Sequence, residues 1–263
     1  MLRSLIESEP IKERLLAIEK ALDEVLPSPT ERPVALHEAM RYAVGAGGKR
    51  IRPLVCLLSA EAVGGDYRDA IEPACAIELL HNYTLVHDDL PAMDNDCMRR
   101  GKPTVWKKYG EALAILTGDA LLSLSYKVAG LSKVNTSSIV SVLGDKGMGV
   151  VRGQVEDVAK LRDADFIYTH KTADLFIASA LMGGYAAGAT EKEIEALGVF
   201  SLNLGLQFQY EDDLLDGDGL YSREETLRRI SESTDSSIRA LSNLKGNVSL
   251  LRDLTLALVS RTV

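Results

Sequence analysis

The sequence has few cysteines, no long apolar run and no signal-like start. Its three cysteines are scattered and form no CxxC pair, which is typical of reduced thiols in a cytoplasm rather than of a disulfide framework. No run of about eighteen apolar residues is present, so no membrane span is predicted. The first ten residues carry two glutamates and only a short apolar run, unlike a secretory signal. We therefore expect a cytoplasmic protein, with a plastid location only if a transit peptide has been removed.

The sequence also lacks an excess of positive charge. Thirty Lys and Arg residues stand against thirty-eight Asp and Glu residues, which gives a net charge of -8 and argues against a nucleic-acid partner. With 263 residues and 46% hydrophobic content, the chain can bury a sizeable core. No shift in composition and no repeat marks a boundary, so we predict a single domain over residues 1–263.

No segment alternates with period two over a length that would make a strand. Apolar residues instead recur at three-and-four spacing along almost the whole chain, which predicts an all-α fold of about ten or more helices. Pro10 is expected to interrupt or start a helix, and the third helix to start after Pro53. The predicted helices cover residues 2–26, 34–44, 54–63, 67–86, 110–131, 136–153, 164–187, 191–216, 223–244 and 249–260.

Residues 87–102 concentrate charge of both signs. Four aspartates, two arginines and one lysine share these sixteen positions. Like charges at this density repel each other, and a folded chain tolerates them best where divalent cations such as Mg²⁺ neutralise the carboxylates. A solvated acidic loop is the alternative interpretation, and a matching partner elsewhere in the chain would decide between the two.

A second acidic cluster supplies that partner. Gln209, Asp212 and Asp216 fall on one face of a predicted helix, where the two carboxylates repel and the helix C-terminus already disfavours anions. Residues 191–222 contain one lysine, Lys192, far from the cluster. Two aspartate clusters, each locally unfavourable, favour a site for metal and diphosphate over two solvated surfaces.

Cations that suit a diphosphate lie upstream. In the segment GGKRIRP at 47–53, two flexible glycines are followed by three cations. This pattern fits a diphosphate that the backbone approaches closely and that cationic side chains bind. A basic turn on the surface would look similar. His81, Thr84 and Asp88 share one helix face, which would direct His81 to the same cavity as Asp88. A histidine in this setting is more often an ordinary core residue.

These segments together resemble the trans-polyprenyl diphosphate synthase family. The resemblance is carried by GGKRIRP at 47–53, LHNYTLVHDDLPAMDNDCMRRGKPT at 80–104 and GLQFQYEDDLLD at 205–216, and is strongest to farnesyl and geranylgeranyl diphosphate synthases of bacterial and plastid type. It extends through LHEAMRY at 36–42, LTGDALL at 116–122, GQVED at 153–157 and HKTADL at 170–175. It implies an isoprenoid synthase fold, with the helices around a central cavity, and a homodimer.

The resemblance also implies roles for individual positions. In the family two aspartate motifs face each other and hold about three Mg²⁺ ions on the allylic diphosphate. The metal ligands would be Asp88, Asp89 and Asp94 from the first motif and Asp212, Asp213 and Asp216 from the second. Arg99 and Lys171 would bind the allylic diphosphate, and Lys49, Arg52, His81 and Arg100, with Gly48 beside them, the diphosphate of isopentenyl diphosphate. Thr172 and Gln209 lie where the family places oxygen groups beside the developing cation, and Gln154 falls in a motif that lines the cavity.

The implied reaction is a Mg²⁺-dependent condensation of isopentenyl diphosphate with an allylic diphosphate. Ionisation of the allylic carbon-oxygen bond leaves a carbocation that the isopentenyl double bond attacks, and no side-chain nucleophile is required. Product length would be set on the helix before Asp88, where Tyr83 and Thr84 lie about one turn upstream. An aromatic floor at Tyr83 predicts farnesyl diphosphate as the main product and geranylgeranyl diphosphate as the alternative, unless Tyr83 is ordinary packing and the floor lies deeper.

Three departures from the family pattern stand out. Cys97 replaces an aspartate and Glu211 a glutamine, and neither change removes an expected metal ligand. After Asp216 the family continues through a mobile loop with GKxxT, whose lysine closes on the allylic diphosphate, whereas this chain continues GDGLYSR. Either the loop is deleted, or the sequence omits residues there.

The missing loop keeps other function classes open. The chain could be a partner subunit of low activity that regulates an active synthase, although retained, mutually repelling carboxylates argue against that. A class I terpene cyclase would not need GGKRIRP. A helical acidic Mg²⁺ or Ca²⁺ binder would not explain Lys49, Arg52, Arg99 and Arg100.

Overall fold

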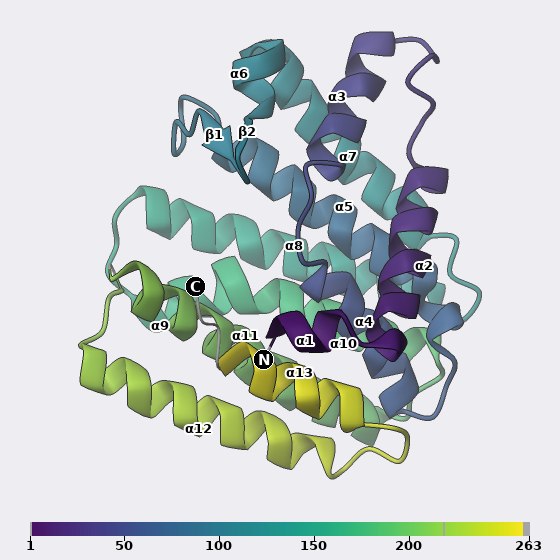
Figure 1. The fold of residues 1–263 in the computed structure, drawn as a ribbon, viewed down its shortest axis with the longest axis vertical. Helices are drawn as coiled ribbons and strands as arrows, with labels where there is room; N and C mark the ends of the chain where they lie inside the picture. Colours follow the sequence, from purple (N-terminus) through teal and green to yellow (C-terminus); the bar gives the residue numbers. More distant parts are fainter. Residues whose placement is uncertain (1, 218, 260–263) are drawn as a thin grey trace.

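The computed structural model describes residues 2–217 and 219–259, and nearly all of them lie in helices (Figure 1). The prediction of an all-α fold with about ten or more helices is confirmed. In chain order the elements are α1 (Leu2–Ile6), α2 (Glu9–Val25), α3 (Val34–Val44), α4 (Ile51–Ala62), η1 (Tyr67–Ala70), α5 (Ile71–Asp88), β1 (Met98–Arg99), β2 (Lys102–Pro103), α6 (Val105–Tyr109), α7 (Glu111–Ala129), α8 (Thr136–Val158), α9 (Ala164–Ile167), η2 (Tyr168–Ala173), α10 (Asp174–Ala186), α11 (Glu191–Asp216), α12 (Arg223–Leu241) and α13 (Ser249–Val259).

Local sequence signals set several helix ends. Pro10 lies in the first turn of α2, where its missing N–H leaves no hydrogen bond unmade. Thr190 and Glu193 form a reciprocal capping box at the start of α11. The same helix ends at Gly217, whose left-handed backbone (φ 75°) lets its N–H bond to the carbonyl of Asp213. The second aspartate cluster is therefore held on the last turns of a well-capped helix.

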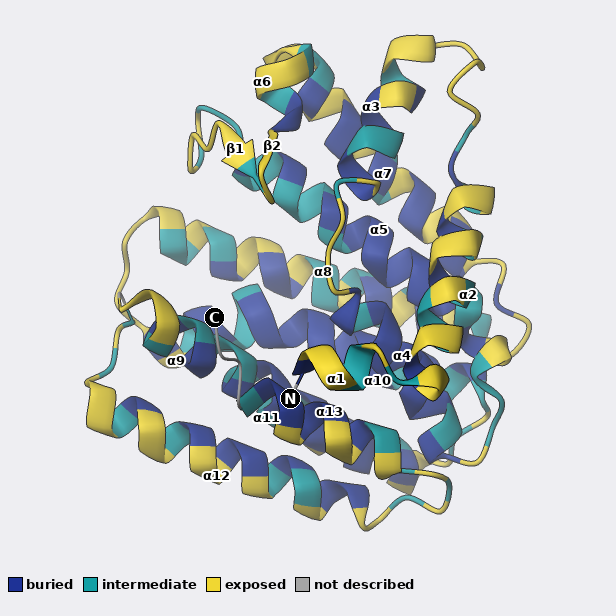
Figure 2. Cartoon of the chain, in the orientation of Figure 1, coloured by how far each residue is buried: buried dark blue, intermediate teal, exposed yellow. Residues whose placement is uncertain are grey.

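The helices pack in layers around a buried centre. α10 contacts α4, α8 and α11, and α5 packs along α7. Figure 2 shows α5 and α10 as mostly buried, whereas α12 is exposed along its outer face. A large apolar core includes the fully buried Phe176 and Phe200, and a smaller cluster forms around Tyr168 and Tyr210. This arrangement places the ends of α5, α8 and α11 and the start of α4 around the cavities described below. That residues 1–263 form a single domain stays a prediction.

Several elements differ from the prediction. A two-residue antiparallel ladder, β1 with β2, and the short helix α6 lie in segments predicted to be irregular. The helix predicted to start after Pro53 is α4, which begins at Ile51 and has Pro53 inside its first turn. Helix α8 continues to Val158, beyond its predicted end at Gly153. Residues 168–173 form a π-helical turn inside a segment that was predicted to be one continuous helix.

One helix in the described part of the chain, α7, is long and apolar enough to cross a membrane by length and composition alone. A core helix of a globular protein passes the same test, and one such helix is weak evidence for a span. α7 packs against α5, α3 and α6, and this packing buries part of its apolar surface.

Candidate active site

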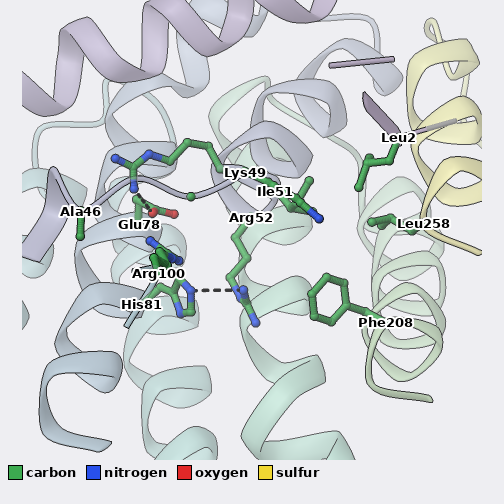
Figure 3. A pocket seen from close by; sticks show the side chains of 12 residues that line it. Leu2, Ala46, Lys49, Ile51, Arg52, Glu78, His81, Arg100, Phe208 and Leu258 are labelled. Carbon is green, nitrogen blue, oxygen red and sulfur yellow. Dashed lines mark hydrogen bonds and ion pairs between the residues drawn. The ribbon is translucent and has the colours of Figure 1, made fainter. Parts of the chain in front are cut away.

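A cavity of about 460 Å³ at the start of α4 gathers the cations of the first predicted diphosphate site (Figure 3). Residues from three distant parts of the sequence meet here: the turn before α4, helix α5 and the turn after β1. All five positions expected to bind the diphosphate of isopentenyl diphosphate line this cavity, namely Gly48, Lys49, Arg52, His81 and Arg100.

Arg52 and His81 lie side by side in this cavity. Arg52 Nη1 is 3.4 Å from His81 Nε2, and the guanidinium lies over the rings of Phe176 and Phe208 at 4.9 and 5.8 Å. Burial lowers the pKa of Arg52 to about 10, against the opposing effect of Glu78. Arg52 Nε and His81 Nδ1 are buried without a hydrogen-bond partner. Buried polar groups are normally satisfied, so these two donors indicate a place for an anionic ligand.

His81 is neutral in this setting. Burial, followed by the nearby charges of Arg52 and Arg100, holds the pKa of His81 well below its usual value of 6.5. A neutral imidazole can donate one hydrogen bond without adding a further charge to a crowded group of cations. His81 therefore complements the arginines as a donor rather than as a cation.

The backbone conformation at position 48 favours glycine, and the Arg100 side chain lies close to it. Gly48 has φ +139°, and a Cβ there would lie 2.7 Å from Arg100 Nη1. The same Nη1 donates to the carbonyl of Gly47. Arg50, the remaining cation of the segment, has a structural role instead. It bonds to Glu78 at 2.6 Å and Glu19 at 2.7 Å and so ties the start of α4 to α5 and α2.

A second cavity, of about 500 Å³ and mostly apolar, lies between α5 and α8. Tyr83, Thr84, Asp88 and Gln154 line it together with valines of α8. The ring of Tyr83 lies edge-on to His87, with 5.0 Å between centroids, and Gln154 Nε2 is buried without a hydrogen-bond partner. The expectation that His81 points into the same cavity as Asp88 is wrong, because His81 lines the cation-rich cavity and Asp88 the apolar one.

The first aspartate motif ends α5 and enters the following turn. Burial raises the pKa of Asp88 to about 6, with Lys171 opposing this effect and Asp94 adding to it. Asp89 is buried and accepts hydrogen bonds from Arg99 Nε and Nη2 at 2.8 and 2.7 Å. Asp94 is exposed, and its N–H donates to the carbonyl of Asp88 at 2.9 Å. In this structure the guanidinium of Arg99 is therefore paired with an aspartate of the first motif.

A third cavity, of about 370 Å³, brings the second aspartate motif to the π-helical turn η2. Thr172 Oγ1 donates to Gln209 Oε1 at 2.6 Å, and Gln209 Nε2 donates to Asp213 Oδ1 at 2.7 Å. Lys171 forms an ion pair with Asp157 of α8, a residue for which the motifs predicted no separate role. The expected allylic-site residues Lys171, Thr172, Gln209 and Asp213 therefore share one cavity.

The other two aspartates of the second motif lie outside this third cavity. Asp212 is partly buried, and its charge raises the pKa of Arg52 against the effect of burial. Asp216 is exposed at the end of α11.

A buried carboxylate anchors η2, and sequence analysis missed it. Asp174, only 1% exposed, accepts hydrogen bonds from His170 Nδ1 at 2.7 Å and Lys146 Nζ at 2.8 Å. Gly153 of α8 lies so close that a Cβ there would be 2.4 Å from the backbone nitrogen of Lys171. The i, i+4 spacing of His170 and Asp174 is visible in the sequence, but the approach of α8 is not.

The aspartates at the ends of α5 and α11 carry the carboxylate oxygens that Mg²⁺ prefers as ligands. Within residues 2–217 and 219–259, no group of three or more His, Cys, Asp or Glu side chains is arranged to hold a metal ion. Mg²⁺ usually takes one or two carboxylates plus substrate phosphates instead of an all-protein cage. The carboxylate oxygens at the ends of α5 and α11 fit Mg²⁺ that arrives with a diphosphate, and the role of each aspartate stays a prediction.

Comparison with known proteins places the chain among prenyl synthases. The family model described as polyprenyl synthetase matches residues 33–235. The chain is 45% identical over 215 residues to geranylgeranyl pyrophosphate synthase 4 of Arabidopsis thaliana, which covers 76% of this chain and 57% of that protein. It is 43% identical over 219 residues to the heterodimeric geranylgeranyl pyrophosphate synthase large subunit 1, chloroplastic, of the same plant, covering 76% and 58%. The chain thus spans less than two thirds of these relatives.

A solved structure matches over its full length. The FPP/GFPP synthase from Zymomonas mobilis superposes with a TM-score of 0.90 at 30% identity, covering 99% of this chain and 100% of that one. Fold, motif order and sequence similarity agree, and the chain belongs to the polyprenyl synthetase family.

Proposed function

We propose that this protein joins isopentenyl diphosphate to an allylic diphosphate, with geranylgeranyl diphosphate as its main product. The observation that carries the proposal is the cavity at α4, where cations surround two buried nitrogen atoms, Arg52 Nε and His81 Nδ1, that have no hydrogen-bond partner. A diphosphate satisfies both donors and offsets the charge of Arg52. The allylic substrate would lie across the apolar cavity and the cavity at η2, with its diphosphate toward Lys171.

The side chains divide the work between binding and charge stabilisation. Mg²⁺, held by aspartates at the ends of α5 and α11, would act as a Lewis acid on the departing pyrophosphate. Arg99 and Lys171 bind the same pyrophosphate and exchange their present carboxylate partners for it. Thr172 and Gln209 present oxygen atoms to the developing carbocation. The valine-lined wall of α8 keeps water from the prenyl chain, and the proton lost from the new unit passes to pyrophosphate.

Product length is the part of the proposal that differs most from the first expectation. An aromatic floor at Tyr83 favoured farnesyl diphosphate, whereas the two Arabidopsis thaliana relatives reported above are named geranylgeranyl pyrophosphate synthases. The solved structure from Zymomonas mobilis is named an FPP/GFPP synthase. Tyr83 lines the apolar cavity and is partly buried, which keeps farnesyl diphosphate as the second candidate product.

The test is an incubation of the protein with Mg²⁺, isopentenyl diphosphate and dimethylallyl, geranyl or farnesyl diphosphate in turn, followed by identification of the products. Geranylgeranyl diphosphate from all three primers supports the proposal, and accumulation at the farnesyl stage supports the second candidate. If no primer is elongated, the enzymatic proposal fails.

A regulatory subunit is the alternative from another function class. The observation in its favour is the name of one relative, the large subunit of a heterodimeric synthase, together with the missing GKxxT segment. Under this alternative the protein alone elongates no primer but changes the activity or product of a second synthase when mixed with it. Under the main proposal it is active alone, as a homodimer.

A further inference from the structure

Two cations lie at the rim of the cavity at η2. Lys160 and Arg162 line this cavity with Lys171, Gln209 and Asp213. Lys171 is held by Asp157, but no ion pair joins Lys160 or Arg162 to a carboxylate within the part of the chain that the structure describes. Both side chains are exposed and therefore able to turn toward a ligand in the cavity.

The backbone of Lys160 is unusual for a lysine. Lys160 has φ 55°, and its N–H bonds to the carbonyl of Asp157 at 2.9 Å while that of Leu161 bonds to Glu156 at 3.0 Å. These bonds close α8 in a Schellman motif, whose left-handed position strongly favours glycine. A lysine there costs conformational energy, which is commonly retained where the side chain serves a function.

The connection between α11 and α12, residues 217–222, contributes Leu220 to the wall of this cavity and carries no lysine or arginine. Described residues of this connection are tied down: Leu220 N–H donates to Tyr168 Oη at 3.0 Å, and Tyr221 Oη donates to Asp165 at 2.8 Å. Arg229 lies over the ring of Tyr221 at 4.0 Å. A further cation that binds the ligand must therefore come from another wall of the cavity.

We propose that Lys160 and Arg162 bind the diphosphate of the allylic substrate from the α8 side of the cavity and supply positive charge that residues 217–222 do not carry. The inference rests on the proposed function. Asp157 and Asp213 border the same cavity, so a diphosphate would enter beside two carboxylates. Together with Lys171, two further cations offset this repulsion and add charge-assisted hydrogen bonds to the ligand.

A simpler explanation for Lys160 is that cations are stabilised at helix C-termini by the helix dipole. The variant Lys160→Gly separates the two explanations, because it removes the cation and relieves the left-handed backbone at once. Under our proposal the Lys160→Gly/Arg162→Ala variant unfolds at the same or a higher temperature than the parent but binds diphosphate more weakly. Loss of binding then cannot be assigned to loss of fold.

The experiment titrates inorganic pyrophosphate with Mg²⁺ into each protein by calorimetry and, separately, measures KM for geranyl and isopentenyl diphosphates. We expect the double variant to raise Kd for pyrophosphate and KM for geranyl diphosphate by about tenfold or more, with KM for isopentenyl diphosphate unchanged. The matched control Lys133→Ala/Arg252→Ala removes the same charge from exposed residues outside the cavity and should change neither constant.

An unchanged Kd and KM in the double variant overturns the inference, as does a rise only in KM for isopentenyl diphosphate. An equal loss in the control pair also overturns it, since the effect would then come from net charge. If the parent elongates no primer, the proposed function fails while the pyrophosphate titrations still decide the role of Lys160 and Arg162.

Discussion

At the scale of single residues, the cation-rich cavity combines a permanently charged side chain with one kept neutral. Arg52 remains a cation although burial lowers its pKa to about 10, and His81 beside it stays uncharged. Such a pair can bind a diphosphate strongly while limiting repulsion among the cations when the ligand leaves. Keeping His81 uncharged lowers the free energy of unfolding, and the size of this loss depends on pH.

Stability should fall on acidification in a way that depends on His81. In the folded protein the pKa of His81 lies well below 6.5, whereas the unfolded chain recovers a value near 6.5. Below that pH the unfolded state takes up a proton that the folded state refuses, so the free energy of unfolding decreases. Between about pH 7.5 and about pH 5.5 the loss from this group approaches 1.4 kcal/mol.

The measurement is urea denaturation of the parent and His81→Gln at both pH values. The variant should lose less stability than the parent over this interval. Equal losses in the two proteins would show that His81 titrates normally in the fold.

Replacing Arg52 should separate binding from stability. Arg52→Met keeps the contacts with Phe176 and Phe208 but removes a buried charge whose Nε has no partner. We expect KM for isopentenyl diphosphate to rise by about tenfold to a hundredfold, with the melting temperature unchanged or higher. Steady-state kinetics and thermal unfolding provide the two readouts, and an unaltered KM would remove Arg52 from the binding site.

Tyr83 is the residue on which product length is expected to depend. Its ring lines the apolar cavity one turn before Asp88, so truncation to alanine should extend the cavity and yield longer products than the parent makes. Product chromatography after incubation with isopentenyl diphosphate provides the readout. Tyr185→Ala, a partly buried tyrosine that lines none of the three cavities, is the control. Products of unchanged length from Tyr83→Ala would place the floor elsewhere.

Residue types and spacing predicted which residues line the same cavity. They predicted less well the partner that each side chain contacts. Gly48, Lys49, Arg52, His81 and Arg100 do line one cavity. Asp157 was missed as the partner of Lys171, because a carboxylate on another helix leaves no local pattern. The i, i+4 spacing of His170 and Asp174 is visible in the sequence, but the burial of Asp174 is not. The direction of His81 was mistaken because a shared helix face does not fix which neighbouring wall a side chain meets.

At the scale of elements, the contact of α8 with η2 explains a glycine that looked like a helix end. Gly153→Ala would bring a Cβ to 2.4 Å from the backbone nitrogen of Lys171, so the two elements must separate. We expect a loss of about 1–3 kcal/mol in unfolding free energy and weaker binding of the allylic substrate.

Gly147 provides the control on the same helix, because its added Cβ would meet Leu80 at 3.5 Å, an ordinary contact. Gly147→Ala should be neutral or stabilise by up to about 1 kcal/mol, through the helix propensity of alanine. Chemical denaturation and KM values test both variants. Similar losses at the two positions would mean that the loss at Gly153 does not come from its close contact with Lys171.

Helix bounds were predictable where local signals end a helix and not where packing does. Residues 34–44 and 191–216 were predicted to the residue, the second helped by its capping box and final glycine. The π-helical turn η2 packs against α8 and α11, and the hairpin of β1 with β2 is too short for period-two alternation to show. Apolar periodicity carries no information about such contacts.

At the scale of the whole molecule, apolar side chains remain exposed on α7 and beyond it. Ile115 and Leu116 are 45% and 56% exposed, and Leu131 and Met148 are 57% and 54% exposed. A second copy of the chain that covers this surface would remove apolar area from water, which agrees with the homodimer implied by the resemblance. Leu116→Glu should therefore raise the proportion of monomer.

Sedimentation velocity over a series of protein concentrations measures this shift. Leu16→Glu on α2 is the matched control, since Leu16 is 70% exposed on another element. A monomeric parent would contradict the homodimer. It would then favour a different synthase as the partner.

The tied connection between α11 and α12 has a consequence for the fate of the substrate. Leu220 is held by Tyr168, and Tyr221 by Arg229, so we expect this part of the rim to stay in place when the allylic bond ionises. The carbocation would then meet two competing nucleophiles, the isopentenyl double bond and water. Part of each allylic diphosphate should end as a prenyl alcohol, and the ratio of alcohol to elongated product measures how well the remaining walls exclude water.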